Sequence, residues 1–78
     1  MTRKEIINVM ELCSCGTRIE WTGNLDNTLH RGVVDEFHPN HGAEEAYLGV
    51  IEPGHYIPVL GASEIENIQI LEERNHDA

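Results

Sequence analysis

Residues 35–45, with the sequence DEFHPNHGAEE, hold four carboxylates and two histidines within eleven positions. Carboxylate oxygens and imidazole nitrogens are common ligands of zinc and other divalent metals. His38 and His41, together with one of these carboxylates, are therefore candidate metal ligands. The segment lacks the stereotyped ligand spacing of known zinc sites, and its composition equally fits the solvated polar turn of a β-hairpin. We favour the polar turn and keep the metal-binding module as an alternative.

The carboxylates of this segment also predict a binding surface. If the flanking strands pair through the turn, Asp35 and Glu36 lie close to a second acidic pair on the neighbouring strand. Like charges that face each other destabilise a hairpin, so solvent, a protonated histidine, a cation or a basic partner must relieve the repulsion. The four carboxylates predicted to bind a basic partner are Asp35, Glu36, Glu44 and Glu45.

The overall charge restricts the class of partner. The 78 residues include 14 acidic and five basic side chains, for a formal net charge of −9. Nucleic-acid affinity comes mainly from lysine and arginine at phosphates, and the basic residues here form no stripe, so direct binding of nucleic acid is disfavoured. An acidic surface favours association with a basic protein surface. A second acidic patch that could bind a basic partner is predicted at Glu64, Glu66, Glu72 and Glu73.

No pattern in the chain indicates an enzyme or a cofactor site. The sequence has no nucleophile elbow, no glycine-rich phosphate loop and no His-Glu-x-x-His pattern. Cys13 and Cys15 lack the second cysteine or histidine pair of a strong zinc motif, and their spacing is unfavourable for a relaxed disulfide. We therefore expect reduced thiols and a non-enzymatic chain without a cofactor.

The first element is predicted to be a short helix over residues 3–13. Thr2 and Glu5 have the spacing of a capping box, in which each side chain accepts a hydrogen bond from the other residue's free backbone N–H. Apolar residues follow at helical spacing, and Gly16 stands where a helix would stop. The helix is expected to pack over its own sheet, and docking on a partner is the alternative.

From Thr17 onward the apolar residues alternate or form short runs, which predicts five strands. Gly32 indicates a bulge or bend, and Pro58, which lacks an N–H, indicates an edge strand or a bulge. Pro53 and Gly54 fit a tight turn. The expected strands are RIEWT, LHRGVVDEF, AYLGVI, HYIPVL and ENIQIL. Of the four aromatic residues, Trp21 and Phe37 are predicted in the core, and Tyr47 and Tyr56 as contact residues.

The order of these elements over residues 17–71 resembles the small five-stranded barrels of the SH3-like and Sm-like superfolds. In many of them a glycine followed by two valines, here Gly32-Val33-Val34, lies in a bent second strand. The barrel is closed by a last segment that contains a proline, then a Glu-Ile pair and then a further isoleucine. The acidic chain with its leading helix is also similar to the small inhibitors of the transcription terminator Rho. Barrels of this kind often contact RNA, which leaves a nucleic-acid-associated barrel within a larger complex as a second alternative.

The predicted protein is thus mainly β, a single domain over residues 1–78 with a short N-terminal helix, a five-stranded SH3-like or Sm-like barrel and a disordered tail over 73–78. No apolar run reaches the length of a membrane span, and the N-terminus is unlike a signal peptide, so a cytoplasmic location is expected. The predicted function is a non-enzymatic acidic protein-binding module, a small regulator or inhibitor that engages a basic protein surface.

Overall fold

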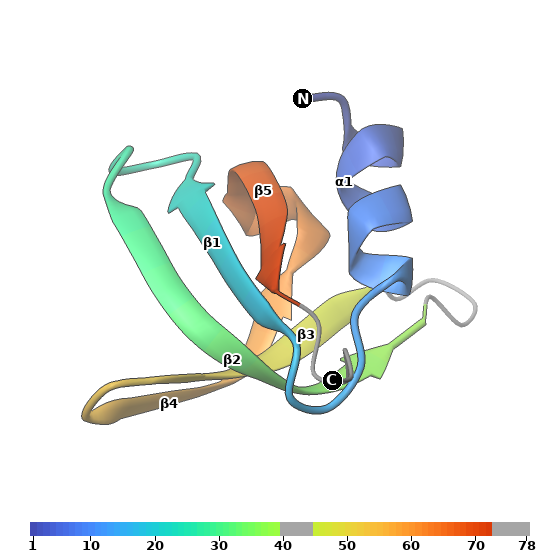
Figure 1. Cartoon of the computed structure of the whole chain (residues 1–78). Coiled ribbons are helices and arrows are strands. Elements are labelled where there is room, and N and C mark those ends of the chain that lie inside the picture. Colours follow the sequence, from blue (N-terminus) through green and yellow to red (C-terminus); the bar gives the residue numbers. More distant parts are fainter. Residues whose placement is uncertain (40–44, 73–78) are drawn as a thin grey trace.

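The computed structural model describes residues 1–39 and 45–72, which form one short helix and one antiparallel sheet (Figure 1). The elements are α1 (Arg3–Glu11), β1 (Arg18–Gly23), β2 (Leu29–His38), β3 (Tyr47–Glu52), β4 (His55–Gly61), the 3₁₀ turn η1 (Ala62–Glu64) and β5 (Ile65–Glu72). The predicted helix, five strands and mainly β class are confirmed. His41, Glu44, Glu73 and the predicted disordered tail lie outside the described residues.

The capping box predicted at the start of α1 is present. The Thr2 hydroxyl accepts a hydrogen bond from the Glu5 N–H at 3.1 Å, and the Glu5 carboxylate accepts one from the Thr2 N–H at 2.8 Å. Hydrogen bonding to the Glu5 carboxylate, first from the Thr2 backbone N–H and then from the Thr2 side chain, lowers the pKa of Glu5 because it favours the charged form. The helix ends at Glu11, two residues earlier than predicted, and the Leu12 N–H bonds the Val9 carbonyl in a tighter final turn.

The five strands have the order β4-β3-β2-β1-β5, and neighbouring strands are antiparallel. The β3–β4 hairpin extends to one side of the molecule in Figure 1, whereas α1 lies beside β5 on the other. Because β4 and β5 are the two edges and do not pair with each other, the sheet is open rather than a closed barrel. Helix α1 packs against β5 and η1, on the side of the sheet away from β4.

Irregularities in the strand register fall at particular residues. Val34 pairs with Val50 and Glu36 pairs with Gly49, so Asp35 is the extra residue of a bulge in β2. Gly32 was expected to indicate a bulge or a bend; its register with β1 is regular, and the bulge lies three residues further along β2. In β4 the extra residue falls between Ile57 and Leu60, which confirms that a bulge in an edge strand accommodates Pro58.

The core lies between the inner face of the sheet and α1. Met10 of the helix and Ile19 and Leu48 of the sheet are fully buried, and Trp21 is buried as predicted. Phe37, predicted to be a core residue, is half-buried and packs against this cluster. Further buried apolar residues come from β2, β3, β4, η1 and β5: Val34, Val50, Leu60, Ala62, Ile65 and Ile68. Among the described residues, no helix has the length and apolar character to cross a membrane.

Candidate functional site

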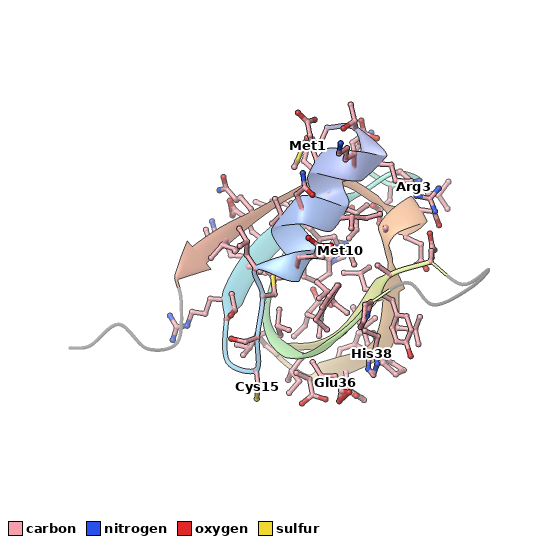
Figure 2. The ribbon with its side chains drawn as sticks, turned by 90° about the vertical axis from the view of Figure 1, so that its right-hand side faces the viewer. Met1, Arg3, Met10, Cys15, Glu36 and His38 are labelled. Atoms are coloured by element: carbon pink, nitrogen blue, oxygen red, sulfur yellow. The ribbon has the colours of Figure 1, made fainter. Side chains whose placement is uncertain are left out.

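Five of the residues singled out in the sequence meet on the outer face of β2, β3 and β4. We call this cluster the acid–aromatic face, and it consists of Asp35, Glu36, His38, Tyr47 and Tyr56. Val34 and Leu48 point into the core, so their neighbours along the strands point outward, and the bulge at Asp35 lets the consecutive residues Asp35 and Glu36 share this outer face. His38 pairs with Tyr47 across the two strands. In Figure 2 Glu36 and His38 lie next to each other, on the side of the sheet away from α1.

Direct contacts join the side chains of the acid–aromatic face. The Tyr56 hydroxyl donates a hydrogen bond to the Asp35 carboxylate at 3.3 Å. The Glu36 carboxylate lies 3.0 Å from Nε2 of His38, whose ring stacks on Tyr47 with centroids 4.4 Å apart and planes at 16°. The Glu36 side chain is 58% exposed, and Tyr56 as a whole residue is 52% exposed. Exposed carboxylates beside aromatic rings suit a lysine or arginine side chain, through ion pairing and cation–π attraction.

The electrostatics of this face are visible in the pKa of Tyr56, which is raised above its usual value. Loss of solvent around the phenol is the largest cause, followed by the negative charge of Asp35, its hydrogen bond to the phenol and the charge of Glu36. In the folded chain the phenol therefore keeps its proton to higher pH than in the unfolded chain. The corresponding contribution to stability is complete below about pH 10 and is lost as the pH rises through the folded pKa.

We expect Asp35→Asn to lower the pKa of Tyr56, because the substitution removes a neighbouring negative charge. Absorbance of the tyrosinate during an alkaline titration measures this change, in a Tyr47→Phe background that leaves Tyr56 as the single tyrosine. Glu11→Gln removes one carboxylate from the exposed side of α1 and should leave the titration unchanged. Equal titration curves for Asp35→Asn and Glu11→Gln would contradict the described contact.

Glu45, predicted to join the acidic pair of β2, has a different position. Its carboxylate contacts the Arg3 guanidinium at 2.9 Å and accepts hydrogen bonds from the Ser63 N–H at 3.0 Å and the Ser63 hydroxyl at 2.8 Å. It thereby links η1 to the start of α1. The predicted crowding of carboxylates across the hairpin is wrong for the described residues, since Glu36 faces Gly49.

The second predicted acidic patch is divided by the length of β5. Glu64 and Glu66 are both exposed near the start of this strand, where the Glu64 carboxylate accepts a hydrogen bond from the Gly61 N–H at 3.4 Å. Glu72 ends the same strand, six residues beyond Glu66, which corresponds to about 20 Å in an extended chain. The structure thus brings Glu64 and Glu66 together at one end of the sheet and places Glu72 at the other.

Within residues 1–39 and 45–72, no group of three or more side chains suited to hold a metal ion is found, and the candidate ligand His41 lies outside these residues. His38 contacts Glu36 and Tyr47 as described above. Cys13 is buried, and its thiol lies 3.5 Å from the Val9 carbonyl. Cys15 is exposed and points away from the protein in Figure 2. Neither cysteine forms a disulfide, and the two thiols lie in different environments.

The sequence interpretation missed two arginines that line a common groove. Arg18 and Arg31 are distant along the chain, but Arg18 pairs with Val33, two residues after Arg31, so both belong to the same outer face. Alternation along β2 already indicates that Arg31 and Val33 lie on the same face of the sheet. Only the register between β1 and β2 shows that Arg18 lies on that face as well.

Comparisons with models of protein families, with curated proteins and with solved structures find no match to this chain.

Proposed function

We propose that the chain is a non-enzymatic protein-binding module, a small regulator or inhibitor whose acid–aromatic face engages a basic protein surface. We further propose that its open five-stranded sheet with a leading helix is a variant of the SH3-like or Sm-like small barrel. The strand order and the antiparallel pairing of all neighbours support this relation.

The observation that carries the proposed function is the convergence of Asp35, Glu36, Tyr47 and Tyr56 on one outer face. Two carboxylates and two phenol rings meet there on paired strands, and the bulge at Asp35 turns the carboxylates of two consecutive residues toward the same face. A basic side chain laid against this face would meet negative charge and an aromatic ring together. The net charge of −9 would accelerate the approach of a basic partner at low salt.

Charge reversal at Glu36 tests this proposal. The tagged chain is incubated with a lysate of its source cells after nuclease and chelator treatment, and bound proteins are eluted with a salt gradient. We expect a basic protein to elute from the native chain at moderate salt. Glu36→Lys should retain it several-fold less well, because a charge at the rim of an interface acts on association and salt dependence.

Glu11→Lys is the matched control, since it reverses one exposed glutamate on α1, on a different part of the surface. Equal retention by the two variants would show that overall charge, rather than the acid–aromatic face, holds the partner. Partners that bind in a parallel lysate without nuclease, and all disappear when nuclease is added, would instead favour a nucleic-acid-associated role.

A further inference from the structure

A groove of about 650 Å³ opens on the sheet beside the turn that joins β3 to β4. This volume is within the range of about 300–1,000 Å³ that is usual for small-molecule sites. Its walls come from β1, β2, β3, the β3–β4 turn and β5. The residues that decide its chemistry are Arg18, Arg31, Val33, Ile51, Glu52 and Leu71.

The groove has an apolar surface that solvent reaches. Val33 pairs with Arg18 on one side and with Ile51 on the other, so these three residues form a row across the sheet. Ile51 and Leu71 are 48% and 46% exposed, so solvent reaches nearly half of each residue's surface. An apolar ligand body laid on this surface would remove it from water, at about 25 cal/mol for each Å² covered.

Positive charge borders this apolar surface. The Arg31 side chain is 71% exposed, and Glu20 contacts it through Nε at 3.1 Å. A guanidinium has five N–H donors, so the terminal nitrogens of Arg31 can bind a second anionic group. Glu52 also lines the groove, but its carboxylate lies 3.0 Å from Nδ1 of His30. The negative charge of Glu52 is therefore next to the histidine ring. The Arg18 side chain belongs to the same lining.

The charge of the whole chain limits the ligand to a weakly charged one. With a formal net charge of −9, the protein repels a polyanion at long range far more than a molecule with one negative charge. We propose that the groove binds a small amphiphilic monoanion, with its carboxylate or sulfonate at Arg31 and its apolar body over Val33 and Ile51. This groove borders the acid–aromatic face, because Ile51 pairs with Tyr56 across β3 and β4, but the two share no residue.

Binding of 1-anilinonaphthalene-8-sulfonate, an aromatic monoanion that fluoresces in apolar surroundings, tests the proposal on the native chain. We expect saturable binding of one dye molecule. Octanoate should displace it, whereas octanol at the same concentration should displace it much less, because octanol has no charge for Arg31. Arg31→Gln should weaken dye binding about fivefold, as expected for an exposed ion pair. Ile51→Ser should weaken it about tenfold through the loss of apolar contact.

Two control variants separate this site from general effects. Lys4→Gln removes one exposed positive charge on α1, and Val59→Ser removes an aliphatic side chain that is 53% exposed on β4 outside the groove. Both should bind the dye within twofold of the native chain. Absence of dye binding to the native chain would overturn the proposal. Equal effects of Arg31→Gln and Lys4→Gln, or of Ile51→Ser and Val59→Ser, would overturn it as well.

Discussion

Met10→Ala is expected to destabilise the protein by about 2–5 kcal/mol, the usual cost of replacing a fully buried methionine by alanine. Met10 has no exposed surface and belongs to the core formed between α1 and the sheet. A domain of this size has a free energy of unfolding of only about 4–12 kcal/mol. The substitution therefore removes a large share of the total, and urea unfolding followed by the fluorescence of the buried Trp21 measures it.

The effect should also appear as a loss of helix. Helix α1 has nine residues, fewer than the roughly 12–15 that an isolated helix needs to persist in water, so its stability depends on packing against the sheet. Far-ultraviolet circular dichroism of Met10→Ala should show this loss as the variant unfolds. Asn8→Ala, at an exposed position of the same helix, is the control and should change stability by no more than about 0.5 kcal/mol. If the two variants unfolded at the same urea concentration, packing of α1 through Met10 would be disproved.

The helix and strands were predictable because local patterns determine them. Thr2 and Glu5 indicate the helix start through hydrogen bonds that form within one turn, and the tight turn at Pro53 and Gly54 separates two apolar segments. The inward direction of Leu48 follows from simple alternation. These signals depend on neighbours along the chain and not on the assembled sheet.

The parts that were not predictable depend on register. Alternation cannot locate the bulge at Asp35, because a bulge appears only when β2 and β3 are paired. For the same reason the sequence was expected to place Glu45 near Asp35 and Glu36, whereas the structure directs Glu45 to Arg3 and Ser63. The members of the acid–aromatic face were singled out separately, His38 as a candidate metal ligand and the others as partner-binding residues, but their meeting on one face, the contact between Tyr56 and Asp35 and the groove beside Arg31 required the assembled sheet.

Gly32→Ala is expected to destabilise the protein by about 1–3 kcal/mol, the cost of overpacking at a tight contact. A Cβ atom at Gly32 would lie 2.7 Å from a methyl carbon of Val50 and 2.9 Å from the Ile51 carbonyl oxygen. The Val50 side chain is fully buried, and the carbonyl belongs to the backbone of β3, so neither can move without displacing the paired strands. The glycine that the sequence associated with a bulge therefore permits close packing of β2 on β3.

Gly49→Ala is the matched control for Gly32→Ala, because Gly49 belongs to the same pair of strands. A Cβ atom there would meet its nearest neighbours at 3.6 Å, an ordinary van der Waals distance. Urea unfolding of both variants should show a loss of stability for Gly32→Ala and a change within about 0.5 kcal/mol for Gly49→Ala. Because Val33 and Ile51 flank the same contact, Gly32→Ala should also weaken dye binding in the groove, whereas Gly49→Ala should not. Equal stability of the two variants would mean that β2 and β3 do not approach each other closely at Gly32.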